Sequence, residues 1–340
     1  MSLSSISSMP APLSRRALLR AAGAASFTAA FGGAASAQPA TLKKVRFATN
    51  ASALCLAPVY LAQDKGVFAK YGLDAELINF GGSSEALLEA IATGKAEGGV
   101  GMALRWLKPL EQGFDVKITA GTHGGCSRLI APVSAGIKTL ADLKGKAIGI
   151  SDQASPGKNF FSILLHKEGV DPVRDVEWRQ YPGEFLSLAA QKGEVAAIAD
   201  GDPKAWRWIK EGKFVQVASN LDHGFEHRVC CIVGLSGKLV REDRPTAAAL
   251  TRALLEAQEL TVASPQEAAA VFSKNAPPGW DVNDLVAVLN DQTHNHHPVG
   301  ADLEKEIALY AEELKAVHVF KPSTDPAKFA KKVYADVLTA

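Results

Sequence analysis

The sequence predicts an α/β protein of two lobes, each with its own sheet, followed by a helical C-terminal region. Short apolar, β-rich runs alternate with amphipathic stretches from Lys43 onward, and this alternation begins again after Lys146. The rhythm is typical of mostly parallel sheets that helices cover on both faces. About 300 residues remain after a leader, which exceeds the size at which a single hydrophobic core usually stops growing.

Residues 1–37 have the features of an export leader. Arg15 and Arg16 precede an apolar run, 21–34, and Ala35-Ser36-Ala37 provides a cleavage site of small residues. This order is typical of a twin-arginine signal peptide. The apolar run is too short and too weak for a membrane anchor, and no cysteine lies near the cleavage point to carry a lipid. We therefore expect a soluble protein in the periplasm.

The charge of the remaining chain argues against nucleic acid as a partner. Removing the leader takes three arginines from the 37 basic residues and nothing from the 36 acidic ones, which leaves a net charge near −2. Such a balance offers no polybasic surface for a phosphate backbone.

The first lobe is assigned to residues 41–125 together with 231–340. In its N-terminal part, β-rich runs predict strands and the amphipathic stretches between them predict helices. The expected strands are 45–49, 75–80, 98–102 and 116–120, and the expected helices are 57–63, 84–92 and 104–112.

The second lobe is assigned to residues 126–230 on the same pattern. Its expected strands are 147–150, 176–181, 195–199 and 214–218, and its expected helices are 160–167, 185–192 and 205–210.

Beyond Arg241 the pattern is helical throughout. Pro245, Pro265 and Pro326 stand where helices begin, since proline suits the first helical turn. The expected helices are 245–262, 265–275, 282–290, 302–314 and 326–338. Two strand-like segments, 116–132 and 228–235, are long or apolar enough to pass between the lobes, and we expect them to form the hinge.

Three loops that follow predicted strands carry small polar residues. They are 50–53, 81–85 and 151–157. Ligands of open α/β sheets bind at the carboxyl ends of strands, where the next helix exposes backbone N–H groups. Ordinary helix capping by Ser83, Ser84 and Ser155 is the alternative. A loop of this kind in both lobes favours ligand binding.

The order of several short motifs resembles the NitT/TauT family of substrate-binding proteins over nearly the whole chain after the leader. The motifs are GVFAKYGL at 66–73, GGSS at 81–84, ATGK at 92–95, TLADLKGK at 139–146 and IGI at 148–150. The resemblance implies a type II periplasmic binding protein fold, with two α/β lobes joined by two hinge strands. It also implies a component of an ABC importer, which captures a small organic or inorganic anion or a heteroaromatic solute and delivers it to a membrane permease. A monomer is the simplest expectation for a protein that must present both lobes to a permease.

The resemblance also implies which residues face the ligand. Arg105, Arg128 and Lys158 lie near the implied loops and are candidates for neutralising an anion, with solvent exposure as the alternative for each. Arg128 and His123 are favoured because the crossing strand must line the cleft. The candidate ligand-binding residues are Asn50, Ser52, Gly82, Ser83, Ser84, Met102, His123, Arg128, Ser155, Gly157 and Asp200.

In the implied fold the two crossing strands run side by side, which brings Cys126 near Cys230 or Cys231. A hinge disulfide, a set of thiols behind the cleft, and three small buried hydrophobic residues all remain open. His123 beside these cysteines has no known zinc spacing, and 294–298, with three histidines, is more simply a surface loop or a helix cap. Neither a metal nor a cofactor is expected.

A cleft enzyme of the same fold is the alternative function. Desulfinases and pyrimidine-precursor synthases that resemble the family use cysteine or histidine, for which Cys55, Cys126 and His123 are candidates. The export leader favours solute capture without catalysis. A sensor subunit that docks to a membrane kinase is a weaker possibility.

Overall fold

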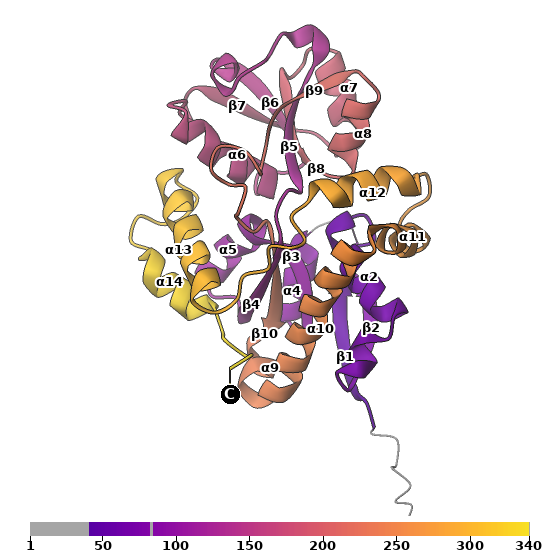
Figure 1. Ribbon diagram of the computed structural model, residues 1–340. Coiled ribbons are helices and arrows are strands. Elements are labelled where there is room, and N and C mark those ends of the chain that lie inside the picture. Colours follow the sequence, from indigo (N-terminus) through magenta and orange to yellow (C-terminus); the bar gives the residue numbers. More distant parts are fainter. Residues whose placement is uncertain (1–40, 82–83, 340) are drawn as a thin grey trace, which may run out of the picture. The chain divides into compact units, whose positions relative to one another are not determined.

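A computed structural model describes residues 41–81 and 84–339, and residues 42–340 form one compact unit (Figure 1). The predicted leader and the candidates Gly82 and Ser83 lie outside the described residues.

The first sheet has five strands in the order β2-β1-β3-β10-β4. β1 pairs in parallel with β2 and β3, whereas β10 runs antiparallel to both of its neighbours. A strand from late in the sequence therefore completes a sheet that begins near the N-terminus. The strands are β1 (Lys43–Thr49), β2 (Leu73–Asn79), β3 (Gly98–Met102), β4 (Val116–His123) and β10 (Cys231–Ser236).

The second sheet repeats this plan in the order β7-β6-β8-β5-β9. β6 is parallel to β7 and β8, and β5 is antiparallel to β8 and β9. In each sheet the antiparallel insert is the strand that follows a crossing from the other sheet. The strands are β5 (Ser127–Pro132), β6 (Lys146–Ile150), β7 (Val176–Gln180), β8 (Ala197–Gly201) and β9 (Phe214–Ser219).

Helices join the strands and cover the sheets (Figure 1). The first sheet's helices are α2 (Ala57–Asp64), α3 (Val67–Lys70), α4 (Ser84–Ala92) and α5 (Ala103–Glu111). Those of the second are α6 (Pro156–Lys167), α7 (Leu186–Gln191) and α8 (Lys204–Lys210). The C-terminal helices are α9 (Gly237–Glu242), α10 (Arg244–Ala263), α11 (Pro265–Asn275), α12 (Val282–Asp291), α13 (Gly300–Ala316) and α14 (Pro326–Val333).

The structure adds detail that periodicity did not predict. The segment 116–132 is two strands, β4 and β5, separated by a turn in which Gly125 has a positive φ of 87°. α3 and α9 were not expected, and α14 ends five residues before the predicted end at 338. Among the helices in the described part of the chain, none combines the length and apolar character that a membrane crossing requires.

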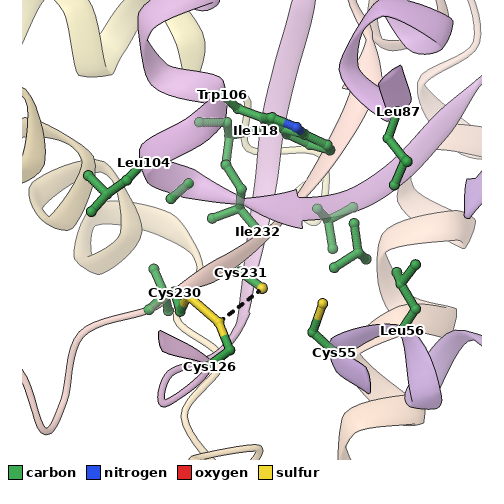
Figure 2. Packing of buried hydrophobic residues seen from close by; sticks show 14 of the residues in the cluster. Cys55, Leu56, Leu87, Leu104, Trp106, Ile118, Cys126, Cys230, Cys231 and Ile232 are labelled. Atoms are coloured by element: carbon green, nitrogen blue, oxygen red, sulfur yellow. Dashed lines mark hydrogen bonds between the residues drawn. A yellow bond between two sulfur atoms is a disulfide. The ribbon is translucent and has the colours of Figure 1, made fainter. Parts of the chain in front are cut away.

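Two glycines make room for Trp106 in the core of the first sheet. The indole of Trp106, in α5, is fully buried. A Cβ on Gly101 of β3 would lie 2.2 Å from its Cζ2 atom, and a Cβ on Gly234 of β10 would lie 2.6 Å from Cζ3. The ring therefore packs directly against the backbone of two neighbouring strands, close to Ile232 (Figure 2).

Replacing Gly101 by alanine should lower the free energy of unfolding by about 1–3 kcal/mol, because a close-packed core accepts an added methyl group only by shifting. Gly183→Ala is the control, since its Cβ would meet only the flexible end of Lys204. Urea unfolding of both variants checks this prediction. Equal stability of the two variants would contradict it.

Candidate functional site

A cavity of about 500 Å³ is lined by residues of both sheets and their loops. The first sheet contributes the loop after β1 and the end of β3. The second contributes the loop after β6, the end of β8 and the loop before α7. This is where strand ends and helix starts meet, as expected for a ligand site of an α/β protein. The polar, charged and small residues at these strand ends and helix starts include Asn50, Ser52, Cys55, Met102, Arg105, Asp152, Ser155, Gly157, Glu184, Asp200, Asp202 and Lys204.

The part of the cavity wall that the first sheet contributes is shaped by a hydrogen bond between a side chain and the backbone. The Asn50 side chain accepts a hydrogen bond of 2.9 Å from the Ser52 amide, which holds the loop after β1 in a tight turn. Met102 is the N-cap residue of α5 and ends β3. Asn50, Ser52 and Met102 thus line the cavity where the sequence placed them.

The second-sheet wall is the start of α6. The Ser155 hydroxyl accepts from the Lys158 amide at 3.2 Å, so the helix-capping alternative describes this side chain. Gly157 follows in the first turn and is buried. Ser155 and Gly157 nevertheless border the cavity, as does Asp200 at the end of β8.

The two cations of the cavity lining are already paired with carboxylates. Arg105 is 8% exposed and its guanidinium contacts the carboxylates of Glu85 and Asp152. Lys204 pairs with Asp200 at 2.6 Å. Four carboxylates line the cavity against these two cations, and the carboxylates are those of Asp152, Glu184, Asp200 and Asp202. The lining therefore carries no surplus positive charge.

Arg128, one of the two favoured candidates, does not line the cavity. Its Nε donates to both carboxylate oxygens of Asp202 at 2.9 Å, and Nη1 donates to Gln216 at 2.6 Å. A further contact joins Arg128 to Asp291 at the end of α12. Burial raises the pKa of the Asp202 carboxyl, and the guanidinium opposes that rise. Arg128 thus takes part in a buried ion pair. The prediction that it lines the ligand site is not met, because it does not border the cavity.

Two further predicted site residues do not line the cavity, and the side chain of a third lies outside the described part of the structure. His123 is fully buried in β4 and is absent from the cavity lining. Lys158 turns to Gln153, whose side-chain oxygen lies 2.9 Å from its Nζ, and burial lowers the pKa of Lys158. The backbone of Ser84 begins α4, and the side chain of this residue is not among the described ones.

Four cysteines lie close together (Figure 2). Cys126 and Cys230 form a disulfide, and the Cys231 sulfur lies 3.8 Å from that of Cys126. Cys55 and Cys231 are free thiols. Their mutual contact lowers the pKa of Cys55 against the effect of burial, while the contact and burial both raise the pKa of Cys231. Cys55 alone of the four lines the cavity.

The histidines of 294–298 do not form one surface loop. His294 is buried, with ring nitrogens 2.7 Å from Gln258 and 3.0 Å from Gln292. Burial holds its pKa well below the usual range. His296 instead faces Glu306 at 3.1 Å. The interpretation of this segment as a surface loop is therefore wrong for His294.

Several lining residues were missed because nothing in their local sequence marks them. Glu184 and Asp202 reach the cavity from loops of the second sheet, and Lys204 from the start of α8. From the sequence, Cys55 was a candidate only for the catalytic nucleophile of the alternative enzyme function. The apolar wall consists of Leu56, Leu87, Val100, Met102 and Pro156.

Known proteins resemble this chain in sequence and in fold. A family model described as NMT1/THI5 like matches residues 55–268. The nitrate import ATP-binding protein NrtC of Synechococcus elongatus is 29% identical over 221 residues, which cover 60% of this chain. The chain spans 33% of that relative and 66% of a Brucella abortus relative.

Two solved structures share the fold. The periplasmic aliphatic sulphonate binding protein SsuA of Escherichia coli has a TM-score of 0.72 at 16% identity, covering 86% of this chain and 92% of that chain. The periplasmic nitrate-binding protein NrtA of Synechocystis PCC 6803 has a TM-score of 0.70 at 15% identity, covering 87% of both chains. These matches confirm the predicted periplasmic binding protein fold and the resemblance to NitT/TauT-type binding proteins.

Proposed function

Because the chain belongs to the NMT1/THI5-like family, we propose that it is the periplasmic solute-binding component of an ABC importer. The observation that carries this proposal is the cavity of about 500 Å³ between residues of the two sheets. A solute held there contacts both sheets only when the protein is closed, so binding shifts the population toward closure. The closed monomer then delivers its solute unchanged to a membrane permease.

The two lobes of this proposal are residues 41–125 with 231–340, and residues 126–230. Ion pairs between them support a closed arrangement. Arg105 of α5 contacts Asp152 after β6, and Arg128 of β5 contacts Asp291 of α12. Lys167 of α6 lies 2.7 Å from Glu313 of α13.

The lining favours an organic solute without net negative charge over nitrate or a sulfonate. Its two cations each have a carboxylate partner, so an anion would have to displace one of them. An apolar wall with a few fixed polar groups suits a small organic molecule. The N-terminal turn of α6 offers backbone N–H groups to a carbonyl or ring nitrogen of such a solute.

A cleft enzyme is the second candidate, and Cys55 is the observation that favours it. Its thiol borders the cavity, and its contact with Cys231 lowers its pKa. A thiol that ionises readily beside a bound substrate is a candidate nucleophile.

Native mass spectrometry of protein isolated from the periplasm should show one small organic molecule per chain, recovered with unchanged mass after denaturation. Direct sequencing of the purified N-terminus in the same preparation checks removal of residues 1–37. Recovery of a chemically altered solute would favour the enzyme, and a bound inorganic anion would contradict the proposed solute class.

Substitution at the cavity gives an independent test. Ser52 is exposed at the cavity, so tryptophan there fills space without disturbing the core. Ser52→Trp should weaken solute binding by at least about tenfold, or 1.4 kcal/mol. Ser134→Trp, at an exposed serine away from the cavity, is the matched control. Isothermal titration with the identified solute measures both, and equal affinities would rule out this cavity as the site.

A further inference from the structure

Three potential metal ligands meet at the base of the cavity. They are Cys55 before α2, His123 at the end of β4 and Cys231 at the start of β10. One donor atom from each residue lies within 4.8 Å of the other two. All three are buried, and Cys55 also borders the cavity. The sequence separations among them give no zinc motif, which is why the sequence predicted no metal.

The His123 ring is held as a metal ligand usually is. Its Nδ1 lies 3.0 Å from the Gly124 carbonyl, so an Nδ1–H donates there and Nε2 keeps its lone pair. This buried Nε2 makes no well-formed hydrogen bond among the described residues, and the Cys55 thiol interacts with the same ring. Metal-bound histidines typically donate their second ring nitrogen to a backbone carbonyl in the same way. A buried nitrogen without a partner is costly, and a metal ion would satisfy it.

The surrounding backbone fixes the positions of the ligands. Cys231 pairs with His123 across the two antiparallel strands, and the Cys230 amide donates to the His123 carbonyl at 2.7 Å. The disulfide between Cys126 and Cys230 uses the other two cysteines, which leaves Cys55 and Cys231 as thiols. In Figure 2 the sulfur atom of Cys231 lies between the disulfide and the sulfur atom of Cys55.

We propose that Cys55, His123 and Cys231 bind one zinc ion at the base of the cavity. Two thiolates and an imidazole are ligands that zinc prefers, and zinc sites with three protein ligands keep a fourth position open. Of the three ligands Cys55 borders the cavity, which is the side from which a fourth ligand would reach the ion. Binding of Zn²⁺ converts the two thiols to thiolates and releases two protons, so the site carries no net charge and binds more tightly as the pH rises. The site does not depend on the importer role.

Cobalt(II) substitution tests the site in the intact protein, purified without a tag, freed of metal and kept with its disulfide oxidised. One Co²⁺ per chain should produce thiolate-to-cobalt charge-transfer absorption in the near ultraviolet and the visible bands of a tetrahedral ion. One equivalent of Zn²⁺ should abolish both. Absence of the charge-transfer band, or the absence of free thiols in the unfolded protein as isolated, would overturn the proposal.

Ligand variants locate the ion. Cys55→Ser and His123→Gln should each weaken zinc binding by at least about 100-fold, since even changes in outer-shell partners of a metal cost about 10–100-fold. His166→Gln, at an exposed histidine, should leave zinc affinity unchanged. Circular dichroism confirms that each variant is folded. Zinc affinity that survives Cys55→Ser would place the ion elsewhere and refute the site.

Discussion

Replacing Arg128 by methionine should lower the free energy of unfolding by about 3–5 kcal/mol, because it leaves a buried carboxylate without its partner. The Asp202 side chain is fully buried and the Arg128 side chain is 8% exposed. Without the guanidinium, the carboxylate keeps only the hydrogen bond of 3.1 Å from the Trp206 amide. Urea unfolding followed by circular dichroism measures the loss.

A second substitution separates the lost charge balance from lost packing. Asp202→Asn in the Arg128→Met background should recover much of the stability, since it removes the uncompensated charge. Arg174→Met is the control, because Arg174 is 82% exposed and pairs with Asp171 on the surface. Such a pair contributes at most about 1 kcal/mol. If Arg128→Met costs no more than Arg174→Met, the buried pair does not stabilise the fold.

Removing the disulfide should have an effect of similar size. Cys126 and Cys230 are 104 residues apart, and closing a loop of about 100 residues stabilises the folded state by about 4–5 kcal/mol through the entropy of the unfolded chain. The double variant Cys126→Ala/Cys230→Ala should show this loss in urea unfolding under non-reducing conditions.

Reducing agent provides the control for the disulfide. Wild-type protein should lose stability on reduction, whereas the double variant should not respond. A wild-type protein that is equally stable in both conditions would show that the cross-link contributes nothing in solution.

Most of the fold could be predicted where the hydrophobic pattern is strong. The ranges expected for β3 and α11 agree with the structure at both ends, and so does that of α4. Short helices were missed because four residues, as in α3, are too few to show a period. The turn between β4 and β5 was missed because nearly all residues on both sides of it are buried, so no exposed polar stretch marks where one strand ends and the next begins.

The candidate site was predicted where it follows from topology. Asn50, Met102 and Asp200 line the cavity because they stand at or just after the carboxyl ends of strands, and parallel strands end at one edge of a sheet. The contacts of side chains on the crossing segments could not be predicted in this way. Whether Arg128 faces a solute or Asp202 depends on a carboxylate 74 residues away, which no local pattern reveals.

The grouping of Cys55, His123 and Cys231 could not be predicted from the sequence either. Each comes from a different part of the chain, and only the insertion of β10 beside β4 brings His123 and Cys231 together. Sequence spacing identifies metal sites within one loop or helix, whereas this cluster depends on strand order.

The late position of β10 has a consequence for synthesis of the chain. The second sheet uses only residues 127–219, whereas the first needs β10 between β3 and β4. A nascent chain that ends before residue 231 therefore exposes two strand edges that face each other without a partner, and exposed edges invite pairing with other chains. A strand made after the whole second sheet thus completes the first sheet, so a ribosome that stalls before residue 231 releases the more aggregation-prone fragment.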